Sequence, residues 1–159
     1  MERLEEIGRY ATVVIDPPWP LQMGFAGRNN GLQANLPYYD MTVADIAALP
    51  VGDCLMSESL LFVWCTNKTL ATALSLLDSY GTKYWFTMTW VKNGGIQLQN
   101  SPMYNSEWCV VGRKGSPKFL TTKAFMTANV WTRRAHSEKP EEFYDLLNRP
   151  NTPLSLIHI

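Results

Sequence analysis

Hydrophobic residues in this chain form short, β-branched runs that alternate with segments of helical periodicity. The run Thr12–Ile15 predicts a buried strand, and the apolar run Leu60–Cys65 predicts a second one. Between them, Thr42 is typical of a helix N-cap because Asp45 follows three residues later, and the helix should continue to about Leu49. Both element types therefore occur in the first half of the chain.

The second half continues the alternation. The spacing of Leu70, Ala73, Leu74 and Leu77 predicts a helix over 70–80, and Gly81 is suited to end it. Further strands are expected at 84–91, 108–112 and 128–131, a last helix at 141–148, and loops at 20–37 and around Gly94, Gly95 and Pro102. Strands that alternate with helices indicate a three-layer α/β sandwich with some antiparallel strands.

The composition is that of one globular domain, with 159 residues of which 46% are hydrophobic and 18% charged. The N-terminus lacks the pattern of a signal peptide and no apolar run is long enough to cross a membrane, so we expect a cytoplasmic protein. Cys54, Cys65 and Cys109 are odd in number and widely spaced, and His136 and His158 are the two histidines. The sequence therefore favours neither a disulfide framework nor a metal site.

The formal net charge is zero, which argues against a strongly cationic nucleic-acid binder. The charges are nevertheless uneven, because basic residues gather between positions 113 and 139, where Glu138 is the single acid. A basic face that contacts phosphate is one interpretation, and a solvated polar surface is the alternative. The basic residues of this segment are Arg113, Lys114, Lys118, Lys123, Arg133, Arg134 and Lys139.

The most specific signal follows the first predicted strand directly: Asp16, Pro17, Pro18 and Trp19. The prolines end the strand and leave the acid and the indole at its carboxyl end, the edge at which open α/β sheets bind ligands. We expect the Pro17 carbonyl to point outward without a strand partner. A carboxylate, a fixed carbonyl and a flat ring suit a planar base with an amino group. The alternative is a surface turn whose Trp19 packs inward.

At this tetrapeptide the chain resembles the MT-A70-like family of S-adenosylmethionine-dependent N6-adenine methyltransferases. The resemblance implies a Rossmann-like fold with a mixed sheet, S-adenosylmethionine as cofactor, and adenine in DNA or RNA as acceptor. Further matching segments stand in the family's order over roughly residues 9–148: Leu36-Pro37-Tyr38, Met41-Thr42, Leu61-Phe62-Val63-Trp64, Thr89-Trp90-Val91-Lys92, Asn105-Ser106-Glu107-Trp108-Cys109-Val110-Val111-Gly112 and His136-Ser137-Glu138-Lys139-Pro140.

The resemblance assigns the catalytic role to the Asp-Pro-Pro-Trp motif. Asp16 would accept one hydrogen bond from the N6 amino group and the Pro17 carbonyl the other, and both groups would also face the cofactor. With a reference pKa of about 3.9, an aspartate is too weak a base to deprotonate the amine, so we expect Asp16 to orient it. Trp19 would stack on the base, with Tyr38 as a second platform or, alternatively, an ordinary core residue.

The later motifs supply the remaining expected site residues. Glu107 would lie beside the substrate pocket, with Lys92 and Arg133 as its partners or as phosphate contacts. Lys139, accompanied by Ser137, would pair with the carboxylate at the methionine end of the cofactor. An exposed lysine just before a helix is the alternative for Lys139.

The family normally continues after the last helix with an acid-Leu-Phe-Ala-Arg strand and then Gly-Trp and Trp-Gly-Asn segments. Here the tail 151–159 is apolar enough to form a strand but lacks the acid. We therefore expect residues 1–159 to form a single methyltransferase domain without its C-terminal cofactor-binding segment.

The predicted function is methyl transfer to adenine N6, with DNA slightly favoured over RNA because the chain is small and carries no RNA-binding module. One alternative is a methyltransferase for another amino group, cytosine N4 or a glutamine side chain. The other is a non-catalytic nucleic-acid-binding partner of an active paralogue. The partner expectations are nucleic acid and a second subunit, in a homodimer or in a heterodimer with a paralogue.

Overall fold

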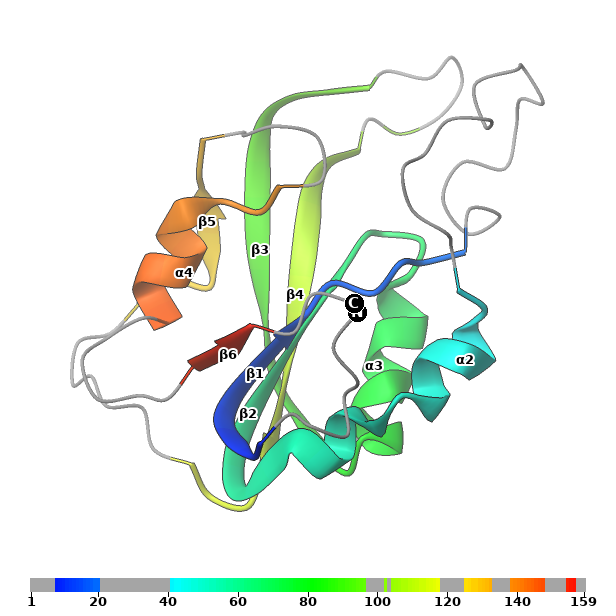
Figure 1. The fold of residues 1–159 in the computed structure, drawn as a ribbon. Coiled ribbons are helices and arrows are strands. Elements are labelled where there is room, and N and C mark those ends of the chain that lie inside the picture. Colours follow the sequence, from blue (N-terminus) through cyan, green and yellow to red (C-terminus); the bar gives the residue numbers. More distant parts are fainter. Residues whose placement is uncertain are drawn as a thin grey trace.

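A computed structural model describes residues 8–20, 41–96, 102, 104–117, 125–132, 138–147 and 154–156. Its centre is a six-stranded sheet in the order β5-β3-β4-β2-β1-β6 (Figure 1). Among these strands, β4 runs antiparallel to both neighbours, while the other adjacent pairs are parallel. The strands are β1 (Tyr10–Ile15), β2 (Leu55–Cys65), β3 (Lys83–Ile96), β4 (Tyr104–Lys114), β5 (Ala128–Val130) and β6 (Leu154–Leu156).

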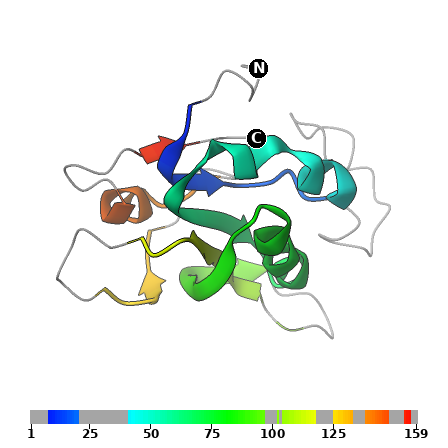
Figure 2. The ribbon, with the colours of Figure 1, turned by 90° about the horizontal axis from the view of Figure 1, so that it is seen from below.

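Helices cover both faces of the sheet. Figures 1 and 2 show α4 (Glu141–Leu147) on one side, with α2 (Val43–Ala48) and α3 (Leu70–Ser79) on the other. A short 3-10 helix, η3 (Pro50–Cys54), connects α2 to β2. The predicted three-layer α/β sandwich with a mixed sheet is confirmed. Within the described segments, the helices are too short to span a membrane.

Each central strand contributes to two separate cores. Successive side chains of a strand point to opposite faces, so Val13 and Ile15 pack with α2 and α3, whereas Val14 packs with α4. On β2, Leu61 and Val63 alternate with Phe62 and Trp64 in the same way. A strand buried on both faces must be apolar at every position, which explains the uninterrupted hydrophobic runs in the sequence.

The helix signals correctly predict the positions of α2 and α3. Thr42 caps α2 by accepting a hydrogen bond from the Asp45 amide at 3.1 Å. Gly81 follows α3 with φ of +72°, a conformation that glycine adopts easily. The predicted buried face of α3 is wrong at Leu74, which is 36% exposed. Leu76 is buried in its place at 2% exposure, so the buried face of α3 runs through Ala73, Leu76 and Leu77.

The β3–β4 pair is longer than predicted. Gly94 and Gly95 were expected in a loop, but both lie within β3, which reaches Ile96 and pairs there with Tyr104. A register shift between Val91 and Ile96 accommodates the glycines. In the sequence the apolar pattern stops near Val91, but main-chain pairing with β4 continues the strand to Ile96. Most of the predicted loop 20–37 lies outside the described residues.

Gly112 tests how tightly α3 packs on the sheet. A Cβ at this position would lie 2.9 Å from the Thr82 Cβ and 3.0 Å from the Leu77 Cδ2. We expect Gly112→Ala to lower the free energy of unfolding by about 2 kcal/mol, measured by urea denaturation, because the core has no space for a methyl group. Gly81→Ala is the control. A Cβ at Gly81 would meet open space, but the positive φ is unfavourable for alanine, so we expect the free energy of unfolding to fall by about 1 kcal/mol. Wild-type stability of Gly112→Ala would contradict this packing.

Candidate active site

The Asp-Pro-Pro-Trp motif leaves β1 at the carboxyl edge of the sheet, as predicted. Ile15 pairs with Val63 of β2, so the motif lies beside the carboxyl end of that parallel strand. The Asp16 side chain is 30% exposed, whereas Pro17 is buried. The motif thus presents an accessible carboxylate on a rigid, buried support.

The turn after β1 anchors Trp19. Its indole Nε1 donates a hydrogen bond to the Trp64 carbonyl at 3.1 Å, and the half-buried ring packs against the core under α2 and α3. The Pro17 carbonyl has no strand partner, as expected, but it is not unpaired, because the Trp19 amide within the same turn donates to it at 2.8 Å. The two prolines close a tight turn instead of leaving the chain extended. A carbonyl oxygen has two lone pairs, so the Pro17 oxygen can still accept a second hydrogen bond.

Four charged residues meet beside this turn. The Lys139 Nζ lies 2.8 Å from Asp16 Oδ2 and 3.3 Å from Glu107 Oε2, and Lys92 forms a further ion pair with Glu107 Oε1. Only 10% of the Lys139 side chain is exposed. We call these four residues, Asp16, Lys92, Glu107 and Lys139, the charge cluster. It joins β1, β3, β4 and the start of α4, and its formal charges sum to zero.

Strand register brings Lys92 and Glu107 together. Glu107 is directly opposite Trp90, so Lys92 is its diagonal neighbour across the β3–β4 pair. The predicted contact between Lys92 and Glu107 is therefore confirmed. Lys139 arrives from the segment before α4, which packs through Phe143 on the same face of the sheet.

Two tryptophans of the matching segments, for which no site role is predicted, lie against the two lysines of the cluster. The Lys139 Nζ lies 5.4 Å from the centroid of Trp64, and the Lys92 Nζ lies 4.6 Å from that of Trp90. Ammonium groups over indole rings gain a cation–π attraction. The two rings meet edge to face with centroids 6.3 Å apart. A signal was available: Trp64 and Trp90 both lie near the carboxyl ends of apolar strands, at the edge that holds Asp16.

The charge cluster favours the ionised forms of Glu107 and Lys139. Burial alone would raise the pKa of the Glu107 carboxyl, but the ammonium groups of Lys139 and Lys92 outweigh burial and hold this pKa below its ordinary value. Burial would likewise lower the pKa of Lys139, but Asp16 and Glu107 raise it. Burial, with Glu107 and Asp16 nearby, raises the pKa of the Cys65 thiol to about 12, so this thiol stays protonated.

These shifts predict how stability depends on pH. The pKa of Glu107 falls below 4.5 on folding, so its contribution is present above pH 4.5 and is lost as the pH falls through the folded value. The pKa of Lys139 rises above 10.5, so its contribution is present below pH 10.5 and is lost as the pH rises through the folded value. Measured by urea denaturation from pH 3 to pH 8, the free energy of unfolding should fall less steeply toward acid pH for Glu107→Gln than for the wild type. Parallel curves would contradict the pairing.

Of the residues predicted to form a basic face or the rest of the site, some are described by the structure and others are not. Lys139 does not belong to an exposed basic face, because its ammonium points inward to two carboxylates. The alternative prediction for this residue, an exposed lysine just before a helix, is wrong for the same reason. Arg113 is exposed and lies over the Trp85 ring at 5.3 Å. Expectations for Tyr38, Arg133, Ser137, Lys118, Lys123 and Arg134 fall on residues outside the described part of the chain.

Comparisons with known proteins agree on one family. The MT-A70 family model matches residues 10–159. The chain is 29% identical over 150 residues, 90% of its length, to an N(6)-adenosine-methyltransferase MT-A70-like protein of Drosophila melanogaster. It is 27% identical over 154 residues, 92% of its length, to an N(6)-adenosine-methyltransferase MT-A70-like protein of Arabidopsis thaliana. It is 26% identical over 150 residues, 90% of its length, to the human N(6)-adenosine-methyltransferase catalytic subunit METTL3.

The aligned region is a small part of each relative. It covers 23% of the Drosophila protein, 21% of the Arabidopsis protein and 24% of the human protein. The chain therefore spans about a quarter of the length of these relatives.

Proposed function

The chain belongs to the MT-A70 family, and from this premise we propose that it takes part in methyl transfer from S-adenosylmethionine to the N6 amino group of adenine. One observation carries the proposal. The Asp16 carboxylate stands at the carboxyl edge of the sheet, 30% exposed and fixed by Lys139 at 2.8 Å. A carboxylate in this position can hold an amino group that enters from the open side.

Asp16 acts by orienting the nitrogen. The N6 lone pair of adenine is delocalised into the ring, so methylation requires the amino group to be held where its lone pair faces the methyl donor. A carboxylate offers about four lone-pair positions, so Asp16 can accept an amino hydrogen while Lys139 remains bound. The Pro17 carbonyl is a second acceptor through its remaining lone pair. The Lys139 contact fixes the direction in which the carboxylate faces.

The charges at this edge fit S-adenosylmethionine, whose amino-acid end carries a carboxylate and an ammonium beside the sulfonium. The Lys139 ammonium has three hydrogens, of which two face Asp16 and Glu107, so one can bind a carboxylate. Asp16 attracts positive groups. When bound, the cofactor supplies an electrophilic methyl group. Lys139 and Asp16 are the described residues that would hold it.

We propose a ribonucleotide acceptor. The sequence alone favours DNA slightly, but the relatives are named for adenosine, a ribonucleoside. The N6 group of a paired base is inaccessible, and extruding a base costs a few kcal/mol, whereas a single strand avoids that cost. Stacking on an aromatic ring contributes about 1–3 kcal/mol per base, and the anchored indole of Trp19 is the candidate ring. Because the human relative is named a subunit, we also propose that the chain works with a companion subunit.

Nucleoside mass spectrometry tests both the reaction and the acceptor. The protein is incubated with S-adenosylmethionine and with single-stranded RNA or DNA oligonucleotides of identical sequence, which are then digested. We expect N6-methyladenosine from the RNA at a yield at least about tenfold above that of N6-methyl-2′-deoxyadenosine from the DNA, because an acceptor site for ribonucleotides would bind the 2′-hydroxyl and lose that contact with DNA. N4-methylcytosine as the product would contradict the proposed reaction. A product formed from DNA alone would contradict the choice of acceptor.

A further inference from the structure

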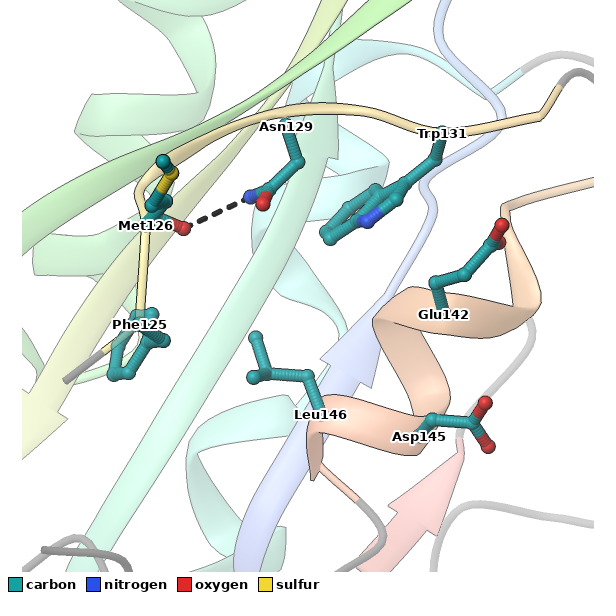
Figure 3. A pocket seen from close by; sticks show the side chains of 7 residues that line it. All are labelled: Phe125, Met126, Asn129, Trp131, Glu142, Asp145 and Leu146. Atoms are coloured by element: carbon teal, nitrogen blue, oxygen red, sulfur yellow. Dashed lines mark hydrogen bonds between the residues drawn. The ribbon is translucent and has the colours of Figure 1, made fainter. Parts of the chain in front are cut away.

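A hollow of about 280 Å³ lies between β5 and α4, separate from the charge cluster (Figure 3). None of the four residues of that cluster is among the described residues that line it. The lining combines apolar and aromatic side chains with one amide and two carboxylates: Phe125, Met126, Asn129, Trp131, Leu146, Glu142 and Asp145. The proposed methyl transfer uses none of them.

The hollow is built on fixed supports. Figure 3 shows Trp131 and Leu146 pointing into the space from opposite sides. The Trp131 main chain is held by the Trp90 indole, whose Nε1 donates to the Trp131 carbonyl at 3.0 Å. Asn129 donates from Nδ2 to the Met126 carbonyl at 2.8 Å and so fixes the turn before β5. An apolar side chain would therefore enter a preformed space and would not have to open one.

The rim of the hollow is acidic. Glu142 and Asp145 are exposed on α4, and their carboxylates point away from the centre of the hollow (Figure 3). Within the described part of the chain, neither carboxylate forms an ion pair. Lys139 is the one basic residue between positions 138 and 147, and its charge is directed inward to Asp16 and Glu107. The described residues of this rim therefore present negative charge, which attracts cationic groups.

An exposed apolar side chain and a sheet edge adjoin the hollow. Met126, which lines the hollow, is 70% exposed, the highest value among the large hydrophobic residues of the described segments. Among the strands of the described residues, the three-residue strand β5 is the last on its side of the sheet. An edge strand offers main-chain donors and acceptors to an added chain. The site thus provides an apolar space, an acidic rim and a pairing edge together.

We propose that this surface binds an extended segment of a partner polypeptide in which an apolar side chain is flanked by basic residues. The apolar side chain occupies the hollow between Trp131 and Leu146. The basic side chains lie against Glu142 and Asp145, with their aliphatic stems on the exposed apolar surface. The main chain of the segment runs along the edge of β5.

Fluorescence anisotropy with a labelled, capped heptapeptide of alternating arginine and leucine tests the proposal. We expect the double variant Glu142→Gln and Asp145→Asn to weaken binding by at least about fivefold, because it removes both rim charges and leaves the hollow unchanged. The control is Glu58→Gln with Asp78→Asn, an equal charge change at two exposed acids of β2 and α3, which should leave the affinity within twofold of wild type. A peptide with serine in place of leucine should bind at least about fivefold more weakly than the leucine peptide.

The two comparisons distinguish specific docking from general attraction. Equal weakening by both double variants, or equal binding of the leucine and serine peptides, would overturn the proposal. Failure of the leucine peptide to bind at millimolar concentration would do the same. Displacement of the peptide by a single-stranded RNA would instead assign the face to nucleic acid and would also overturn it. Circular dichroism melts of each variant confirm that the fold is retained.

Discussion

Replacing Asp16 by asparagine is expected to lower the rate of methyl transfer to adenine N6 by at least about a hundredfold, because a misplaced or weakened acceptor loses the alignment of the nitrogen. The amide is neutral, so the 2.8 Å contact with Lys139 loses its ion pairing and the orienting group can rotate. The measurement is initial velocity with tritium-labelled S-adenosylmethionine and an RNA oligonucleotide.

The matched control for this prediction is Asp45→Asn, which removes a carboxylate from the exposed first turn of α2. It should retain the rate of the wild type within about twofold, because a surface substitution changes little. Binding of S-adenosylmethionine to Asp16→Asn is measured in parallel by calorimetry, so that a loss of cofactor binding is distinguished from a loss of alignment. A rate within threefold of the wild type for Asp16→Asn would contradict the orienting role.

Lys139→Met is expected to have the largest effect on stability among substitutions in the charge cluster. It leaves Asp16 and Glu107 facing each other without the ammonium that lies between them. Removing one partner of a fully buried ion pair costs about 3–5 kcal/mol, and because both carboxylates keep some exposure we expect a loss of about 2 kcal/mol. Urea denaturation at pH 7 measures it.

A second substitution shows whether this loss is electrostatic. Adding Glu107→Gln to Lys139→Met removes one of the two stranded carboxylates, so the double variant should regain part of the lost stability. The two changes must then be non-additive, as expected for groups in contact. A double variant whose loss equals the sum of the single losses would show that Lys139 contributes through packing on Trp64 and not through its charge.

Local patterns predicted those elements that are decided by local interactions. The strands at Val13–Ile15 and Leu60–Cys65 follow from continuous apolar runs, because both strands are buried on both faces. The α2 cap follows from Thr42 and Asp45, which lie within one turn. The extension of β3 to Ile96 could not be predicted, because partners on β4 supply its hydrogen bonds. Tyr104, which pairs with Ile96, lies before the predicted strand 108–112, and the glycines themselves disfavour a strand.

The candidate site shows the same division. Asp16 and its position at the sheet edge could be predicted because a strand and two prolines are adjacent in sequence. The position of Lys139 between two carboxylates depends on how α4 docks on the sheet, which no local pattern records. The hydrogen bond from the Trp19 amide to the Pro17 carbonyl depends on how the chain turns after β1, which the motif alone does not specify.

The central claim is that the Asp16 carboxylate accepts a hydrogen bond from the amino group of the target adenine. The most direct test compares the affinities of the wild type and Asp16→Ala for two single-stranded RNAs that differ at one nucleoside, adenosine or purine riboside, which lacks the amino group. A hydrogen bond to a charged group contributes about 1.5–3 kcal/mol, so the wild type should prefer adenosine by at least about tenfold. Asp16→Ala should lose most of this preference, because the Pro17 carbonyl is then the one remaining proposed acceptor for the amino group. An undiminished preference for adenosine in Asp16→Ala would contradict the claim.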